Sequence, residues 1–284
     1  MKLAFLGTPE VAVPPLRALV ADGHDVRLVV TRADKRRGRG SALVASPVKA
    51  AAQDLGLPVT DQVDDVIDAG AELGVVVAFG RLIKPHVLAV LPMVNVHFSL
   101  LPRWRGAAPL ERAILAGDAE TGVCLMELEE GLDTGPVYAC TNLAIGSEET
   151  AAELRARLVE AGTELLVTSL RDGLGTPTPQ HGEATYADKI DPAEHHIDWQ
   201  RPAVEVHRTI RVGDAWTTFR GKRFKVLRAR LSTDALEPGA IDGLRVGTGE
   251  GALELVEVQP EGKAPMAAAD WRNGARPRPD ERFI

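Results

Sequence analysis

The hydrophobic residues in the first part of the chain form short runs separated by helical stretches. Residues 3–6, 26–30 and 74–79 are nearly continuous apolar runs, and the stretches at 14–23 and 46–56 read as helices, opened by prolines and closed by glycines. Apolar runs of this length are typical of parallel strands that are covered on both faces. The alternation of strand and helix predicts an α/β fold with a doubly wound, mostly parallel sheet.

The same pattern continues to about residue 171. Further strands are expected at 93–97, 123–128 and 136–140, and a long helix at about 148–171. Residues 173–183 then contain glycine, proline, threonine and glutamine with few apolar residues, which is typical of a loop that leads out of a domain.

Beyond this loop the apolar pattern is that of a small all-β domain. Short β-like runs at 224–227, 239–241 and 251–258 are separated by glycine and proline, as in a sandwich or barrel. We therefore predict a first domain over residues 1–183, a linker over 184–203 and a C-terminal domain over 204–284.

The composition is that of a globular protein. Of 284 residues, 45% are hydrophobic and 26% are charged, which excludes a disordered or collagen-like chain. Cys124 and Cys140 are too few for a disulfide framework and have strand-like flanks, so buried free thiols are expected. The apolar run at 3–6 is too short for a secretory signal, and no run has the roughly 18 to 20 apolar residues of a membrane span, which implies the cytoplasm.

The charge is distributed unevenly. The chain has a formal charge of -7. From Arg201 to the end there are 15 basic and 12 acidic residues, a local +3, which leaves -10 on the first 200 residues. Arg220 to Arg230 carries six cations and no anion, and Arg32 to Arg39 carries five cations against Asp34. These local fields allow a polyanionic partner despite the acidic average, although solvated surface stretches are the alternative explanation.

Candidate catalytic residues lie at the end of the strand predicted at 93–97. Asn95 and His97 alternate there, so both side chains face the same side of the sheet. A glycine- and proline-rich loop follows at 98–109, and an acidic turn with two glycines lies at 129–135. An amide to stabilise developing negative charge, an imidazole to move protons and a carboxylate to orient it suit acyl transfer to an amine without a covalent enzyme intermediate. A purely structural histidine is the alternative.

These residues also carry a family resemblance. Asn95-x-His97-x-Ser99-Leu-Leu-Pro102, Arg105-Gly106 and Asp133-Thr-Gly135 resemble the signature of enzymes that transfer formyl from 10-formyltetrahydrofolate to amines. The chain is similar to the members of that family that formylate methionine on initiator tRNA. Further matching segments cover nearly the whole chain: Phe5-Leu-Gly-Thr-Pro9, Gly38-Arg-Gly40, Ser46-Pro-Val-Lys49, Trp104-Arg-Gly-Ala-Ala108, Ala184-Thr-Tyr-Ala-x-Lys189, Ile197-Asp-Trp199, and Val258-Gln-Pro-Glu-Gly-Lys263 with Pro265-Met266.

The resemblance implies a Rossmann-like formyltransferase domain, an OB-like C-terminal domain and a set of site residues. Asn95, His97 and Asp133 would be catalytic, with 10-formyltetrahydrofolate as the formyl donor and no metal. Core packing is the alternative for Leu82 and Ile83. The residues expected at the folate are Gly80, Arg81, Leu82, Ile83, Ser99, Leu100, Leu101, Pro102, Glu130 and Leu132.

The resemblance also implies methionyl-initiator tRNA as a partner, with no membrane and no protein partner. Both basic segments would contact its backbone, which gives affinity that falls with salt. The residues expected at the tRNA are Lys35, Arg36, Arg37 and Arg39 in the first segment, and Lys222, Arg223 and Lys225 in the second.

Other functions fit less well. Gly38-x-Gly40 does not join a strand to a helix, which argues against a dinucleotide-binding oxidoreductase. The histidines at 195, 196 and 207 with Asp191 and Asp198 match no known metal-ligand spacing. A small amine acceptor, such as an amino sugar nucleotide or glycinamide ribonucleotide, would not need the basic segments. A non-catalytic RNA-binding protein would not need Asn95, His97 and Asp133.

Overall fold

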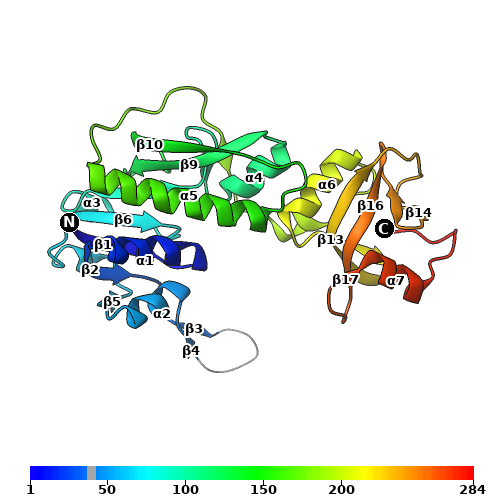
Figure 1. The fold of residues 1–284 in the computed structure, drawn as a ribbon, viewed down its shortest axis with the longest axis horizontal. Helices are drawn as coiled ribbons and strands as arrows, with labels where there is room; N and C mark the ends of the chain where they lie inside the picture. The colour runs from blue at the N-terminus through cyan, green and yellow to red at the C-terminus, as the bar shows by residue number, and fades with distance from the viewer. Residues whose placement is uncertain (37–42) are drawn as a thin grey trace. The chain divides into compact units, whose positions relative to one another are not determined.

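The computed structural model describes residues 1–36 and 43–284, with only the backbone at Arg36 (Figure 1). It separates into two compact units, and each is described by itself. Unit 1 comprises residues 1–109, 120–144 and 155–188, and unit 2 comprises residues 110–119, 145–154 and 189–284. The domain boundaries drawn from the sequence stay a prediction.

Unit 1 is built on a seven-stranded sheet in the order β10-β9-β7-β6-β1-β2-β5. Neighbouring strands from β7 to β5 are parallel, whereas β9 and β10 run antiparallel. This confirms the mostly parallel sheet predicted from the apolar runs. The strands are β1 Lys2–Gly7, β2 Asp25–Val30, β5 Val59–Thr60, β6 Leu73–Val77, β7 Met93–His97, β9 Glu120–Glu127 and β10 Val137–Ala144.

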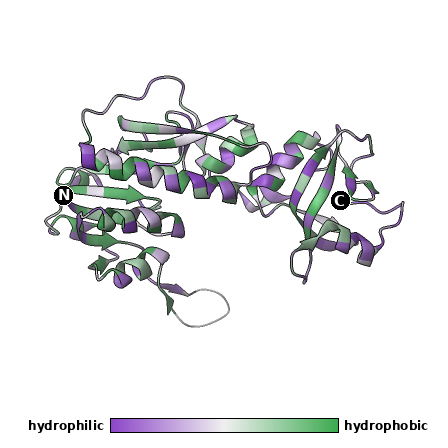
Figure 2. Ribbon diagram, viewed as in Figure 1, coloured by the Kyte–Doolittle hydropathy of each residue, from purple (hydrophilic) through white to green (hydrophobic). Residues whose placement is uncertain are grey.

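The central strands are apolar on both faces because helices cover both. All five residues of β6 are buried, and Figure 2 shows hydrophobic colour along the central strands. On one face, α5 approaches β7 and β9 so closely that a Cβ on Gly162 would meet the side chains of Val123 and Val96 at 3.1 and 3.2 Å. The other face carries Met93 in one core cluster with Val87 of α3. Alternation along β7 therefore places Asn95 and His97 on the Met93 face.

Helices α1 and α2 of unit 1 begin where the sequence signals indicate, whereas α3 was not predicted and α5 begins three residues later than the expected position of about 148. The first turn of α1 contains the proline pair at 14 and 15, and Ser46 caps α2 by accepting the Lys49 N–H at 3.0 Å. The helical elements of unit 1 are η1 Glu10–Ala12, α1 Val13–Ala21, α2 Pro47–Asp54, η2 Asp64–Val66, α3 Pro85–Leu88 and α5 Ala151–Asp172. Two short strand pairs, β3 Lys35–Arg36 with β4 Leu43–Val44 and β8 Arg105–Gly106 with β11 Tyr186–Ala187, stand beside the main sheet.

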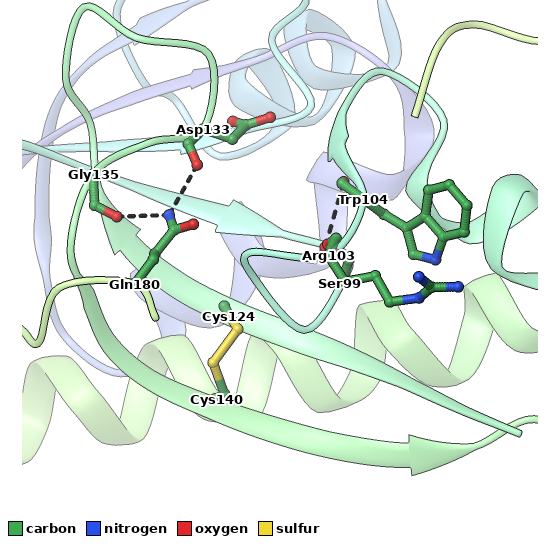
Figure 3. Close-up of a disulfide and its surroundings, with 8 residues drawn as sticks. All are labelled: Ser99, Arg103, Trp104, Cys124, Asp133, Gly135, Cys140 and Gln180. Atoms are coloured by element: carbon green, nitrogen blue, oxygen red, sulfur yellow. Dashed lines mark hydrogen bonds between the residues drawn. A yellow bond between two sulfur atoms is a disulfide. The ribbon is translucent and has the colours of Figure 1, made fainter. Parts of the chain in front are cut away.

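The expectation of buried free thiols is wrong. Cys124 on β9 and Cys140 on β10 form a disulfide (Figure 3). The antiparallel register places the two residues directly opposite each other, with their Cα atoms 4.2 Å apart. Cys124 is buried, but Cys140 is exposed because β10 is the edge strand of the sheet. A pairing between adjacent strands depends on register, which strand-like flanks alone do not reveal.

Unit 2 is built on an antiparallel sheet, as the spacing of the β-like runs predicts. Three helices, α4, α6 and α7, were not predicted. The α6 sequence is amphipathic and buries Val206 and Ile210 against the sheet core. The elements are α4 Pro109–Ala116, η3 Pro192–His195, α6 Ala203–Val212, β12 Trp216–Phe219, β13 Lys222–Ser232, β14 Ile241–Asp242, β15 Arg245–Gly247, β16 Ala252–Pro260, β17 Met266–Ala267 and α7 Ala268–Ala275.

Aromatic rings hold the core of unit 2. Phe219, Phe224, Trp271 and Phe283 lie within contact of one another, with ring centroids 4.8 to 6.3 Å apart. Trp199 stacks on Phe283 and donates its indole N–H to the Thr217 hydroxyl at 2.9 Å. Trp199 and Trp271 are thus packing anchors of this core. Among the residues described, no helix has the length and apolar character needed to cross a membrane.

Candidate active site

His97 lies at the carboxyl end of β7, buried with 5% of its surface exposed. Its Nε2 is 2.9 Å from the main-chain oxygen of Trp104. Because a carbonyl oxygen only accepts, Nε2 must carry the hydrogen and donate it. The other ring nitrogen, Nδ1, is thereby left to face the rest of the site.

Asp133 faces that second nitrogen. Its Oδ2 lies 3.6 Å from His97 Nδ1 and accepts a hydrogen bond from the Gly106 N–H at 2.8 Å. The carboxylate thus lies next to the free side of the imidazole ring, at a distance longer than a hydrogen bond. This is the side on which the sequence predicts an orienting carboxylate.

Asn95 lies two residues before His97, on the same face of β7, and is half-buried. In residues 1–36 and 43–284, no hydrogen bond to its side-chain amide is found. The amide is available to a substrate group at this face. The structure thus brings together the three residues predicted to be catalytic.

The loop at 98–106 is braced from within. The Ser99 hydroxyl is fully buried and donates to the Arg103 carbonyl at 2.6 Å (Figure 3). The Trp104 N–H donates to the Thr185 hydroxyl at 2.9 Å, and the Arg105 N–H donates to the Thr185 carbonyl at 2.9 Å. These bonds continue into the parallel pair of β8 and β11. The segment carrying Thr185 therefore fixes the loop that binds His97.

Gln180, which was not predicted from the sequence, belongs to the same network of hydrogen bonds. Its Nε2 donates to the main-chain oxygens of Asp133 and Gly135, each at 2.8 Å (Figure 3). Its Oε1 accepts from the Nε and a terminal nitrogen of Arg105 at 3.1 and 2.7 Å. No periodic pattern in the sequence indicates Gln180, because residues 173–183 have the composition of a loop that leads out of a domain. The one nearby signal is the motif from Ala184 to Lys189.

Comparison with known proteins identifies the family of this chain. A family model for formyl transferases matches residues 1–170, and a model for the formyl transferase C-terminal domain matches residues 189–276. A methionyl-tRNA formyltransferase from Roseobacter denitrificans is 46% identical over 97% of this chain and 96% of its own. The chain belongs to the methionyl-tRNA formyltransferase family. A further family member, from Heliobacterium modesticaldum, is 42% identical over the full length of both chains.

Solved structures share the fold of this methionyl-tRNA formyltransferase family member. An N-formyltransferase from Helicobacter canadensis, in complex with folinic acid and dTDP-3-aminofucose, matches with a TM-score of 0.70 at 18% identity over 92% of this chain and 99% of its own. HypX from Aquifex aeolicus, in complex with tetrahydrofolic acid, matches with a TM-score of 0.68 at 19% identity over 96% of this chain. The chain spans about half, 47%, of HypX.

The residues that the family resemblance assigns to folate differ in exposure. Leu82 is 79% exposed and Leu132 is 62% exposed, whereas Ile83 is buried in the core cluster of unit 1. Arg81 is exposed and donates to the Asp61 carbonyl at 2.7 Å. Core packing, the alternative for Leu82 and Ile83, therefore holds for Ile83 and not for Leu82. Gly80 lies on the loop of Leu82, Glu130 lies on the loop of Leu132, and Leu100, Leu101 and Pro102 lie on the loop that follows β7.

The residues assigned to tRNA in the first basic segment are only partly described. Arg37 and Arg39 lie outside the described residues, and Lys35 and Arg36 form β3 at the edge of that stretch. The base of the segment is anchored by Lys49, whose ammonium contacts both carboxylate oxygens of Asp34 at 2.9 and 2.8 Å.

The second basic segment, on β13, is less positive than its sequence suggests. Lys225 pairs with Asp214 at 2.6 Å, and Arg228 pairs with Glu153 at 2.6 Å. Arg220 binds Glu281 with two nitrogens and lowers the pKa of that carboxyl to about 2. Lys222 and Arg223 are exposed, and the Arg223 guanidinium lies 4.4 Å from the ring centre of Trp216.

The histidine group around His195 does not form a metal site. Across residues 1–36 and 43–284, no group of three or more histidine, cysteine or acidic residues could hold an ion. The His195 Nδ1 is 2.8 Å from the Gly213 carbonyl, and the His207 Nε2 is 3.1 Å from the Ala229 carbonyl. Burial lowers the pKa of His207. Both side chains brace unit 2.

Proposed function

We propose that this chain transfers the formyl group of 10-formyltetrahydrofolate to the α-amino group of methionyl-initiator tRNA, giving formylmethionyl-tRNA for translation initiation. The observation that carries the proposal is the approach of the Asp133 carboxylate to His97, beside Asn95 on the same sheet face. Relatives of 42 to 46% identity over nearly the whole chain carry the name methionyl-tRNA formyltransferase. The cytoplasm, where tRNA is charged and used, is the corresponding location.

The chemistry is a direct transfer. The uncharged α-amino nitrogen attacks the formyl carbon and forms a C–N bond, which gives a tetrahedral intermediate with a negative oxygen. The bond from this carbon to N10 of the folate then breaks, and a proton passes from the attacking nitrogen to N10. The products are formylmethionyl-tRNA and tetrahydrofolate.

Each residue has a physical role in these steps. The Asn95 amide would donate to the developing oxyanion, a contact that strengthens as charge forms. His97 would move the proton, because an imidazole is the side chain most often used for proton transfer and Nδ1 of this ring is not held by the main chain. Asp133, 3.6 Å from that ring nitrogen, would stabilise the imidazole while it holds the proton.

The folate would lie against the exposed apolar residues of two loops. Leu82 and Leu132 present large apolar surfaces beside Gly80 and Glu130, and a flat pterin ring fits such a surface with main-chain groups at its polar edge. Ser99 supports the proposal indirectly, since its buried hydroxyl holds the loop from Leu100 to Pro102 in place.

A direct assay tests the proposal. The protein is incubated with 10-formyltetrahydrofolate and methionine-charged initiator tRNA, and formylmethionine is measured after the ester is hydrolysed. A parallel reaction supplies an amino sugar nucleotide as acceptor. We expect formylation of the charged tRNA and at least about 100-fold less turnover of the sugar nucleotide. Transfer to the sugar nucleotide alone would support a small-molecule acceptor, and tRNA binding without folate turnover would support a binding protein.

Two lysines on β13 allow a matched test of the tRNA contact. Lys222 is exposed and has no ion pair within the described residues, whereas Lys225 pairs with Asp214 at 2.6 Å. We expect Lys222→Ala to weaken tRNA binding about two- to fivefold and to reduce the slope of log Kd against log salt by about 1. Lys225→Ala should change the slope less, because Asp214 already offsets its charge. Equal slopes for both variants would contradict a contact at Lys222.

A further inference from the structure

The side-chain amide of Gln180 is fully engaged. An amide offers two donor hydrogens and two acceptor positions. Both hydrogens point at main-chain oxygens, of Asp133 and Gly135, and both acceptor positions face the Arg105 guanidinium. The reverse orientation would set the amide oxygen against two carbonyls and the NH2 group against a cation. The contacts therefore fix both the place and the orientation of this amide.

The loop that Gln180 holds needs an external support. Leu128 still bonds to Met93 at the start of β7, so the loop must cross the length of β7 before Asp133 reaches His97 at the other end. Asp133 itself adopts a φ of 51°, in the left-handed region that side chains disfavour. Such a conformation persists where the surroundings determine it.

Gln180 is itself firmly placed. On one side of it, Thr178 exchanges two main-chain hydrogen bonds with Val137, each 2.8 Å long, just after the Asp133 loop. On the other side, Thr185 accepts hydrogen bonds from the N–H groups of Trp104 and Arg105. The segment from 178 to 185 thus connects the Asp133 loop to the loop that carries Gly106, and Gln180 is half-buried between them.

We propose that Gln180 is a positioning residue for formyl transfer: it holds the main chain of Asp133 so that the carboxylate meets His97. The Gly106 N–H holds the carboxylate, and Gln180 holds the main chain of the same residue. Arg105 joins the two contacts, because its side chain binds Gln180 and its main chain leads directly into Gly106. The inference rests on the proposed function, and Gln180 itself touches no reacting atom.

Two substitutions test the role of the amide. Gln180→Met has a similar volume but neither donates nor accepts as an amide does. Gln180→Glu still accepts from Arg105 but turns an oxygen towards the two carbonyls. We expect both to lower kcat by about 10- to 100-fold while KM for tRNA changes less than about twofold. KM for folate should rise by a smaller factor than kcat falls, because Leu132 lies on the same loop. Gln53→Met, on the exposed side of α2, is the matched control and should keep the activity of the unaltered protein.

A double-mutant cycle with Asp133→Asn distinguishes positioning from general support. If Gln180 acts through the Asp133 carboxylate, Gln180→Met should cost less than about threefold in kcat once that carboxylate is gone. A residue that only stabilises the fold would cause the same loss in both backgrounds. Equal losses would therefore overturn the proposal.

Hydrogen exchange tests the same role without catalysis. In Gln180→Met we expect at least about tenfold faster exchange at the Gly106 amide and across residues 131–136, with residues 73–77 of β6 unchanged. Gln53→Met should show neither change. If the unaltered protein fails to formylate methionyl-tRNA, the proposed function falls, and exchange alone still decides whether Gln180 holds Asp133. Unchanged exchange in Gln180→Met, or a kcat within twofold of the unaltered protein, would overturn the inference.

Discussion

The two halves of the candidate site are built by different means. Asn95 and His97 stand on β7, which is paired on both sides, with β6 and with β9. Asp133 stands on a loop, with a left-handed backbone and contacts supplied by Gly106 and Gln180. The strand half inherits its geometry from the sheet, whereas the loop half depends on three or four individual hydrogen bonds. Changes in the contacts that hold the loop half should therefore act through position, and changes in the three catalytic side chains should act through chemistry.

The largest expected effect is the loss of His97. His97→Ala removes the imidazole at this face and should lower kcat about 10³-fold, within the range for a lost general acid–base group. Asn95→Ala should lower it about 10²-fold, as for one oxyanion donor. Both should leave the sheet intact, because the ladder bonds of β7 are main-chain. Stopped-flow or quench measurement of formylmethionyl-tRNA formation checks this, and near-normal turnover in either variant would remove that residue from the mechanism.

Asp133→Asn is expected to have the next largest effect. Asparagine has the same shape and tolerates the left-handed conformation, so the loop should stay in place while the negative charge is lost. We expect kcat to fall about 30- to 100-fold with an unchanged melting temperature. Asp68→Asn, at an exposed position of unit 1, serves as the control. A variant that melts several degrees lower would indicate that Asp133 serves the loop more than the reaction.

Gly106→Ala should have a smaller effect and acts on the loop half alone. Gly106 has a φ of 117°, and a Cβ there would meet the Ala187 carbonyl oxygen at 3.0 Å. The main chain must shift, which moves the N–H that holds Asp133. We expect about a tenfold loss of kcat and a loss of about 1–3 kcal/mol in the free energy of unfolding. Gly70→Ala imposes a similar backbone strain, φ 67° with open space, away from the site, and should reduce stability without the loss of kcat.

The sequence predicted the strand half better than the loop half, because the strand half depends on local patterns and the loop half depends on long-range contacts. Apolar runs and strand alternation are local patterns, and they located β7 at Met93 to His97 and put Asn95 and His97 on one face. Asp133 came from a motif and not from periodicity. Gln180 acts on residues about 45 positions away, through a side chain in a segment without regular structure. No local pattern records such a contact, just as none recorded the register that pairs Cys124 with Cys140.

Removing the disulfide should have the smallest effect on activity. This variant tests whether the disulfide or the Gln180 amide positions the Asp133 loop. The bond between Cys124 and Cys140 encloses the Asp133 loop, but β9 and β10 are also joined by a ladder of main-chain pairs from Val137 to Ala144. Closing a loop of this length contributes at most about 3 kcal/mol, and less where the strands already pair. Reduction, or Cys140→Ser, should lower the melting temperature by a few degrees and change kcat less than twofold. Thiol titration confirms the reduced state. A loss of kcat as large as that of Gln180→Met would mean that the disulfide, and not the Gln180 amide, sets the position of Asp133.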